Sequence, residues 1–224
     1  MAKRLIIVVV SLIFKIIARI KIKNIENLPT GGPIMITSNH IGILDGVLIP
    51  AIPTARAHPN LIVIIAEKYE KRPLFNWAIK HLEFMYIDRF NPDIRTVREV
   101  VNRLRNDGFL IIAPEGTRSP NSSLIEGKKG AAYIAAKTNA WVVPMSLIGC
   151  GDKTMRERLL KFKKLDITIT LGKPFKIPNL PHENQDQYLQ KYTDEIMCQI
   201  AALLPTENRG LYSQHPRLKE ILQI

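Results

Sequence analysis

The sequence has little cysteine and few aromatic residues, and each shortage excludes a class of protein. Its two cysteines, Cys150 and Cys198, lack CxxC or other metal-ligand spacing, so a disulfide scaffold and a zinc site are disfavoured and a reducing compartment is the simplest interpretation. Aromatic residues make up 7% of the 224 residues, and no RRM-like, zinc-finger or helix-turn-helix signature occurs, which argues against nucleic-acid binding. Internal repeats, low-complexity tracts and linkers rich in Gly, Ser or Pro are also absent, so we expect one folded domain.

Acidic residues are scarce relative to basic ones. The sequence has 32 Lys and Arg against 20 Asp and Glu, which gives a formal net charge of +12. An excess of this size favours an anionic partner, such as nucleic acid, a phospholipid surface or a phosphorylated small molecule. The hydrophobic content of 46% and the charged content of 23% are ordinary for a globular domain.

A long apolar run is missing as well. Residues 5–14 (LIIVVVSLIF) are apolar apart from Ser11, whereas about 20 apolar residues are needed to span a bilayer. A signal peptide is disfavoured because no small-x-small cleavage site follows. On a helical wheel the polar residues form one stripe, made of Arg4, Ser11, Lys15 and Arg19. The pattern predicts that residues 1–18 form a helix in the interface of an anionic membrane, peripheral or monotopic on the cytoplasmic face; the alternative is a core helix of the domain itself.

Short apolar segments alternate with helical patterns along the rest of the chain. Several of these segments are apolar throughout, as is typical of strands covered on both faces. Strands are predicted over 19–25, 34–37, 61–66, 84–88, 109–113, 141–148 and 166–171. Helices are predicted over 45–50, 74–81, 93–106, 128–138, 153–161 and 183–203, followed by a polar stretch after Pro205 that wraps the surface. The sequence therefore predicts an α/β fold in which residues 19–224 form a single domain, with a mixed, largely parallel central sheet flanked by helices.

One loop at a predicted strand end carries a histidine and an aspartate five residues apart. His40 and Asp45 follow the strand 34–37, and on a continuous helix they would lie about 140° apart and could not pair. If Gly42 breaks the path, the carboxylate can fold back onto the imidazole and form a general-base pair. The alternative is a structural histidine beside an aspartate that caps the 45–50 helix.

Three further segments carry charged groups suited to an anionic substrate. Glu115 and Arg118 follow the strand 109–113 and can contact a hydroxyl and a phosphate, or they can form an ion pair in a charged turn. Asp88-Arg89 closes the strand 84–88, where an arginine is a natural anion ligand. Lys128 and Lys129 open a predicted helix that can bind an anion, or they are solvated. The basic stretch 153–164 is predicted to be a solvated face, with a headgroup contact as the alternative.

The order of these blocks resembles that of a known family. The blocks are Asn39-His40-x-x-x-x-Asp45, then Tyr86-Ile87-Asp88-Arg89, then Pro114-Glu115-Gly116-Thr117-Arg118-Ser119, then Val143-Pro144-Met145. Over roughly residues 20–175 the chain resembles the glycerolipid acyltransferases, specifically the 1-acylglycerol-3-phosphate O-acyltransferase branch. Gly42 stands where a serine is frequent and Gly127 where a phenylalanine is frequent, so acceptor and acyl-chain specificity stay open.

The resemblance implies transfer of a fatty acyl group from acyl-CoA or acyl carrier protein to the free hydroxyl of lysophosphatidic acid, giving phosphatidic acid in phospholipid biosynthesis. His40 acts as general base in this scheme, Asp45 holds its ring, and neither a cysteine nucleophile nor a metal or other cofactor is implied. The residues that the resemblance assigns to substrate binding are Asn39, Arg89, Glu115, Gly116, Thr117, Arg118 and Lys128.

The partners expected are a lysophospholipid, an acyl thioester, an anionic membrane surface and, if it carries the acyl group, acyl carrier protein; nucleic acid is not expected. Two rival interpretations stay open. One is an acyltransferase for a different lysolipid, and the other is a non-catalytic protein whose basic face binds a membrane surface.

Overall fold

Residues 2–48, 52, 58–66, 85–87 and 93–223 are described by a computed structural model, and within them eight strands form one mixed sheet. The strands are β1 (Ala18–Lys23), β2 (Ile34–Ser38), β3 (Leu61–Ala66), β4 (Met85–Ile87), β5 (Phe109–Ile112), β6 (Trp141–Ile148), β7 (Leu165–Leu171) and β8 (Phe175–Lys176). The α-helices are α1 (Ala2–Ile17), α4 (Ile94–Arg105), α5 (Gly130–Thr138), α6 (Asp152–Leu160), α7 (Gln185–Ala202) and α8 (Pro216–Leu222). Short 3-10 turns include η2 (Asp45–Val47) and η6 (Gly210–Tyr212).

The sheet is parallel through its centre and becomes mixed toward one edge. The strand order is β1-β7-β6-β2-β5-β3-β4, with β8 paired to β6. All neighbours from β6 to β4 run parallel, whereas β7 runs antiparallel to β6 and β1 runs parallel to β7. The predicted α/β fold with a mixed, largely parallel sheet is therefore confirmed. Because β5, β2 and β6 are adjacent and parallel, their carboxyl ends lie at one edge of the sheet.

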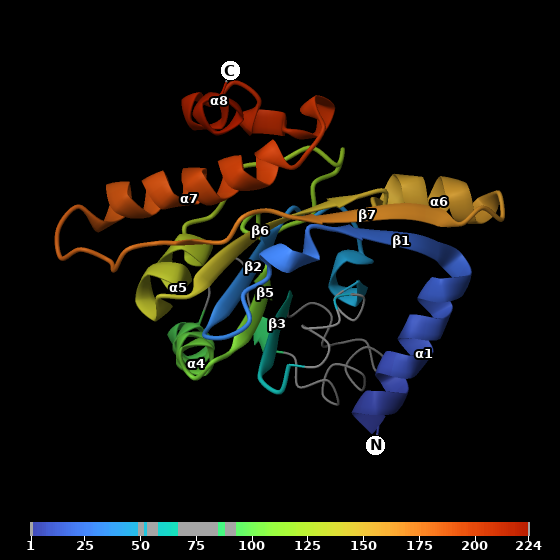
Figure 1. The fold of residues 1–224 in the computed structure, drawn as a ribbon, viewed down its shortest axis with the longest axis horizontal. Coiled ribbons are helices and arrows are strands. Elements are labelled where there is room, and N and C mark those ends of the chain that lie inside the picture. The colour runs from blue at the N-terminus through green and yellow to red at the C-terminus, as the bar shows by residue number, and fades with distance from the viewer. Residues whose placement is uncertain (1, 49–51, 53–57, 67–84, 88–92, 224) are drawn as a thin grey trace.

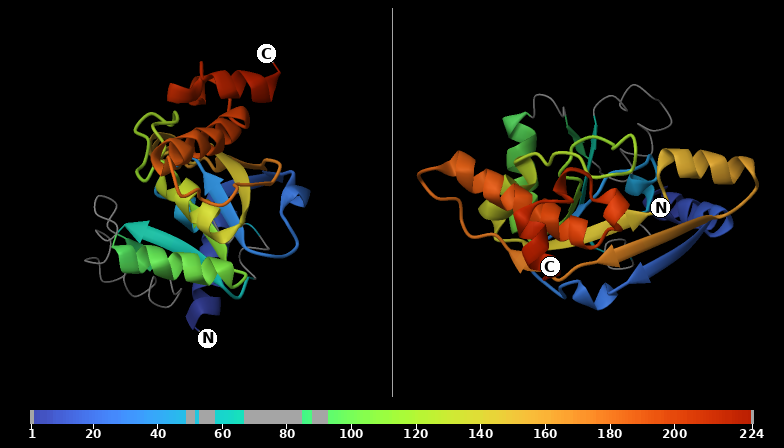
Figure 2. Two further views of the ribbon diagram at one scale, coloured as in Figure 1. Left: turned by 90° about the vertical axis from the view of Figure 1, so that its left-hand side faces the viewer. Right: turned by 90° about the horizontal axis from the view of Figure 1, so that it is seen from above.

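Both faces of the central sheet are buried, which explains the apolar runs of its strands. Successive residues point to opposite faces, so Met35 and Leu110 belong to the cluster formed with α4, α5 and α7, whereas Ile36 and Phe109 belong to the second cluster. Phe14 of α1 belongs to that second cluster. Figures 1 and 2 show the same division, with α4, α5 and α7 on one side of the strands and α1 on the other.

The N-terminal helix packs through only part of its surface. Phe14 is buried against the second cluster and Ile17 is half-buried. Of the side chains that the structure describes in α1, five apolar ones are exposed, namely Val8, Val9, Leu12, Ile13 and Ile16. Among the described helices, none combines the length and the apolar character needed to cross a bilayer.

Some predicted boundaries differ from the observed ones, and one strand and one α-helix were not predicted. The helix expected at 128–138 begins at Gly130, and η2 is the described part of the helix expected at 45–50. The helix expected at 74–81 and the ends of the strand expected at 84–88 lie outside the described residues. The unpredicted elements are β8, which is too short to show a period, and α8. His215 starts α8 by accepting a hydrogen bond from the Arg217 N–H, and its Leu218 is buried against α7.

Candidate active site

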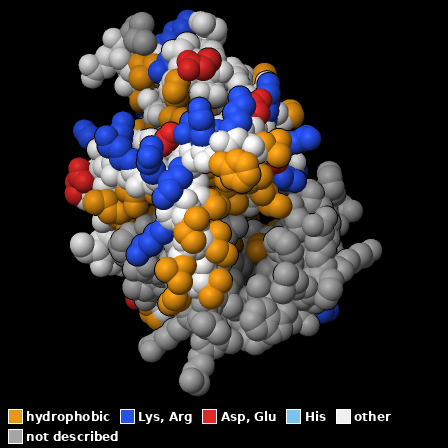
Figure 3. Space-filling view, turned by 90° about the vertical axis from the view of Figure 1, so that its right-hand side faces the viewer, with side chains coloured by type: hydrophobic (Ala, Val, Ile, Leu, Met, Phe, Trp, Pro, Cys, Tyr) orange, Lys and Arg blue, Asp and Glu red, His pale blue; other side chains and the backbone are white. Residues whose placement is uncertain are grey.

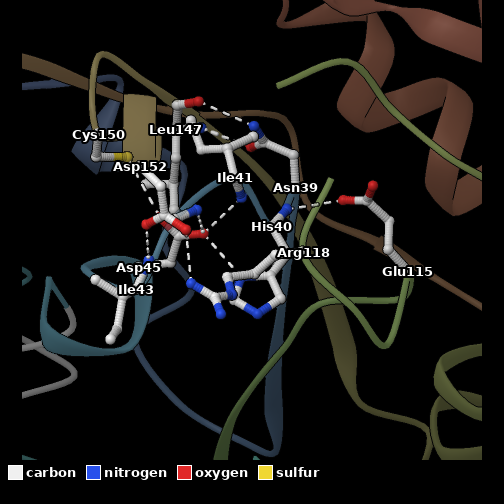
Figure 4. Close-up of polar contacts among 11 residues, drawn as sticks. Asn39, His40, Ile41, Ile43, Asp45, Glu115, Arg118, Leu147, Cys150 and Asp152 are labelled. Carbon is white, nitrogen blue, oxygen red and sulfur yellow. Dashed lines mark hydrogen bonds and ion pairs between the residues drawn. The ribbon is translucent and has the colours of Figure 1, made fainter. Parts of the chain in front are cut away.

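Three loops meet at the carboxyl ends of β5, β2 and β6. The loop after β2 carries His40 and Asp45, the loop after β5 carries residues 114–119, and the turn after β6 carries residues 149–152. Figure 4 shows side chains from all three loops directed toward one another. The adjacency of the three parallel strands thus brings together segments that are far apart in the sequence.

His40 and Asp45 form a hydrogen-bonded pair. His40 Nδ1 lies 2.8 Å from Asp45 Oδ2, and the same oxygen accepts hydrogen bonds from the backbone N–H groups of Ile41 (2.7 Å) and Gly42 (3.0 Å). The carboxylate therefore folds back over its own loop, while η2 begins without a side-chain cap. Because an ionised carboxylate can only accept, Nδ1 carries a proton and the neutral ring offers its Nε2 lone pair as a base. The His40 side chain is 28% exposed, and that of Asp45 is 8% exposed.

Cys150 in the turn after β6 and Asp152 at the start of α6 hold the histidine loop in place, and neither is among the site residues that the sequence predicts. The Cys150 thiol donates to Asp45 Oδ1 over 3.4 Å, and burial, reinforced by the Asp45 charge, raises the pKa of this thiol. Asp152 accepts from the Ile43 N–H through Oδ1 (2.8 Å) and from Arg118 Nη1 through Oδ2 (2.6 Å). Their position directly after a central strand was the available signal, since polar groups there reach the same edge of the sheet.

Glu115 braces the histidine loop from the opposite side. Its side chain is buried, Oε1 accepts from the His40 N–H over 2.7 Å, and Oε2 accepts from the Ile125 N–H over 3.1 Å. The Ser119 N–H donates to the His40 carbonyl over 2.8 Å, so the 115–119 loop holds both backbone groups of His40. Burial raises the pKa of Glu115 to about 7, although its two backbone hydrogen bonds oppose the shift. Substrate contact by Glu115 stays a prediction, because the contacts seen here are to the protein itself.

Asn39 is also directed toward the protein. Its Nδ2 donates to the Leu147 carbonyl (2.9 Å) and its Oδ1 accepts from the Leu147 N–H (2.7 Å). This buried amide joins the end of β2 to β6 and fixes where the histidine loop starts.

Arg118 and Thr117 line a polar cavity beside the loop that carries His40. The cavity has a volume of about 270 Å³, and its polar lining comprises Thr117, Arg118, Ser119, Ser122, Asp152 and Lys153. The ion-pair partner of Arg118 is Asp152. The alternative in which Arg118 pairs with Glu115 within a charged turn is therefore wrong. The lining holds two cations and one carboxylate, so its net charge is positive, and with its hydroxyl groups it is suited to a phosphate.

The two lysines that precede α5 lie in different surroundings. Gly116, at a φ of +65°, lies beneath the Lys128 side chain, whose Cδ is 3.1 Å from the position that a Cβ would occupy. Lys129 pairs with Asp186 of α7, with its Nζ 2.7 Å from the carboxylate. The structure thus brings Lys128, but not Lys129, next to the 114–119 loop. Asp88 and Arg89 lie outside the described residues.

The chain is similar to known acyltransferases. The model of the family described as Acyltransferase matches residues 19–148. The chain is 32% identical over 156 residues to a 1-acyl-sn-glycerol-3-phosphate acyltransferase of Cocos nucifera, covering 68% of this chain and 49% of that protein. It is 30% identical over 139 residues to the chloroplastic 1-acyl-sn-glycerol-3-phosphate acyltransferase LPAT1 of Arabidopsis thaliana, covering 59% and 37%.

A solved structure shares the fold. The crystal structure of the 1-acyl-sn-glycerophosphate (LPA) acyltransferase PlsC from Thermotoga maritima superposes with a TM-score of 0.59 at 22% identity, covering 87% of this chain and 78% of that one. The chain spans less than half the length of the two plant relatives.

Gly42 is expected to tolerate no side chain. A Cβ at Gly42 would overlap the Cys150 carbonyl oxygen, whereas a Cβ at Gly46, four residues along the chain, has no neighbour within 4 Å. Gly42→Ser should therefore lower the free energy of unfolding by roughly 1–3 kcal/mol, and Gly46→Ser should change it little. Denaturant unfolding of both variants checks this. Equal stabilities would show that the turn after β6 does not press on the histidine loop.

Glu115 should make stability depend on pH in a way that Glu115→Gln removes. A native pKa of about 7 against a usual 4.5 means that the folded state binds this proton more tightly than the unfolded state. The stabilising contribution is fully present below about 4.5 and is lost as the pH rises through about 7, a change of roughly 3 kcal/mol. Unfolding free energies of both proteins measured from pH 5 to 8 give the difference, in which other titrations cancel. If the unfolding free energies of the wild type and Glu115→Gln change with pH in the same way, the raised pKa of Glu115 is contradicted.

Proposed function

The chain belongs to the Acyltransferase family, and from this premise we propose that it transfers a fatty acyl group from a thioester to the free hydroxyl of lysophosphatidic acid, giving phosphatidic acid. The observation that carries the proposal is the 2.8 Å contact between His40 Nδ1 and Asp45 Oδ2 in a braced loop beside a cationic cavity. The names of the similar plant proteins support lysophosphatidic acid as the acceptor.

The geometry suits direct attack by the acceptor. His40 Nε2 takes the proton of the lysolipid hydroxyl as its oxygen attacks the thioester carbon, and Asp45 stabilises the imidazolium that forms. Collapse of the tetrahedral intermediate forms the ester and breaks the carbon–sulfur bond, and the imidazolium returns its proton to the leaving thiolate. The product ester and a free thiol account for all atoms. Either coenzyme A or acyl carrier protein can serve as the carrier in this scheme.

Neither cysteine is placed to act as the nucleophile. The Cys150 thiol is buried, donates to Asp45 and has its pKa raised by burial. Cys198 is buried in α7, in the cluster on the other face of the sheet, and burial raises its pKa to about 12. A thiol must ionise to attack a thioester efficiently, and the raised pKa of both cysteines opposes this. Direct attack by the acceptor hydroxyl, with His40 as base, is therefore the route we propose.

The acceptor phosphate is proposed to bind in the polar cavity. Arg118 reaches it from the loop after β5 and Lys153 from the start of α6, so two chain segments supply positive charge. Arg89 and Lys128 stay candidate phosphate ligands, Lys128 because its side chain lies over Gly116.

Membrane docking through α1 completes the proposal. A lysolipid and its product reside in membranes, and the exposed apolar side chains of α1 offer a surface that can enter the lipid interface. Two basic residues near the junction, Lys15 in the last turn of α1 and Arg19 in β1, are exposed and suited to anionic headgroups. A peripheral position on the cytoplasmic face of a membrane is part of this proposal.

Loss of the His40 base should abolish transfer without unfolding the protein. His40→Ala is expected to lower the turnover by about 10²- to 10⁴-fold. Asp45→Asn should also cause a large loss, because the Nδ1-protonated tautomer of His40 is no longer held in place. The assay follows acyl transfer from labelled acyl-CoA and acyl carrier protein to a panel of lysolipids, with products identified by mass spectrometry. His182→Ala, at an exposed histidine, is the matched control. Near wild-type turnover in folded His40→Ala protein would refute the mechanism.

Arg118→Ala should weaken binding of the phosphate-bearing acceptor selectively. Loss of the charge-assisted hydrogen bonds between the guanidinium and the phosphate should raise the KM for the acceptor by roughly 10- to 150-fold. Arg118→Lys should restore part of the lost affinity. The KM for the thioester should change little. The KM values for the acceptor in Lys153→Ala and Arg89→Ala show which other cations contribute to phosphate binding. An unchanged acceptor KM in Arg118→Ala would place the phosphate elsewhere.

A further inference from the structure

The loop that joins α6 to β7 exposes a large apolar side chain at its tip. Phe162 is 100% exposed and the neighbouring Leu160 is 70% exposed. Phe162 also has a φ of 52°, a left-handed conformation that costs a non-glycine residue about 1–2 kcal/mol. Its N–H donates to the Leu159 carbonyl as the chain leaves α6, a position where glycine is usual. The phenyl ring of Phe162 is therefore not buried by the domain, and its residue has an unfavourable backbone conformation.

Cations surround this ring. Residues 161–164 read Lys-Phe-Lys-Lys, and all four side chains are exposed. The acidic group next along the chain, Asp166, is paired with Arg158 (2.5 Å) and lies 3.8 Å from Arg19, so nearby arginines offset its charge. An aromatic side chain among lysines matches the interface of an anionic bilayer, where the ring enters the acyl boundary and each ammonium contacts headgroups.

The loop is tied to the N-terminal helix. Lys164 Nζ donates to the carbonyl of Lys15, in the last turn of α1, over 2.9 Å. Figure 1 shows the end of α6 and the junction of α1 with β1 at the same end of the molecule. Figure 3 shows that end face-on, with hydrophobic side chains in a band below a group of Lys and Arg side chains. The exposed apolar side chains of α1 and the α6–β7 loop therefore lie on neighbouring parts of one surface.

We propose that the α6–β7 loop, residues 159–164, is a second membrane-inserting element that docks on an anionic bilayer together with α1. The inference rests on the proposed membrane docking and extends it to a loop that is far from the helix in the sequence but next to it in the structure. Phe162 and Leu160 enter the lipid, while Lys161, Lys163 and Lys164 remain at headgroup level. The positive charge of the loop favours anionic lipid over an apolar protein groove.

Vesicle sedimentation of the full chain tests the loop directly. With vesicles of phosphatidylglycerol and phosphatidylcholine, Phe162→Ser should bind roughly 10- to 100-fold more weakly than the wild type, as expected for loss of a buried ring. Leu211→Ser is the matched apolar control, since Leu211 is 71% exposed on η6, and it should bind as the wild type does. Lys161→Glu combined with Lys163→Glu should weaken binding by about 10-fold or more, whereas Lys219→Glu on α8 should not.

Depth is measured with a tryptophan probe. Phe162→Trp should be quenched by brominated acyl chains in these vesicles, and Leu211→Trp should not exceed the signal of the native tryptophans. If the wild type does not sediment with vesicles, membrane docking itself is refuted and this proposal with it. If residues 2–17 are needed but Phe162→Ser binds normally or the probe is not quenched, only the loop proposal is overturned. A change in oligomeric state of Phe162→Ser without a change in vesicle binding would assign the loop to a contact between copies and also overturn it.

Discussion

The carboxylate of Asp45 is the group on which the geometry of this site depends. One of its oxygens accepts from a side chain and two backbone N–H groups within six residues of the chain, and the other accepts from a thiol supplied by the turn after β6. A nearly buried charge is stable only when its oxygens are satisfied in this way. The same contacts that stabilise the charge also bend the loop and aim the imidazole, so folding and catalytic orientation share one set of hydrogen bonds.

The surrounding sheet extends this constraint over a large part of the chain. Asn39 ties the start of the histidine loop to β6, and Glu115 ties the backbone of His40 to the loop after β5. Both side chains are buried, and each makes two hydrogen bonds to backbone groups. Those of Asn39 go to the N–H and the carbonyl of one residue, Leu147 of β6. The position of His40 therefore depends on backbone contacts across three strands and not on the His40–Asp45 pair alone, and under the proposed function this preorganises the base before substrate binds.

The sequence predicted the sheet and the pairing of His40 with Asp45 because both leave local signals. The apolar runs at 61–66 and 141–148 marked central strands, and the glycine between His40 and Asp45 allowed the return of the carboxylate. Long-range partners left no such signal. Nothing near Arg118 indicates that Asp152 is its ion partner, and nothing in Glu115 indicates a buried brace rather than a surface carboxylate. Helix boundaries also shifted where no side-chain cap marks them, as at α5, which begins at Gly130, two residues later than its pattern predicted.

Helix α1 ends at Ile17 and β1 begins at Ala18, so no residue separates the helix from the edge strand of the sheet. A flexible linker would let the sheet rotate relative to α1, but no residue lies between the two elements. The hydrogen bond from Lys164, in the loop before β7, to the Lys15 carbonyl ties the helix to a second segment of the domain. A lipid surface that fixes the direction of α1 thereby fixes the tilt of the sheet. Under the proposed function, the edge of the sheet that holds His40 keeps one height and one orientation above the bilayer, so that each lysolipid acceptor reaches it in the same orientation.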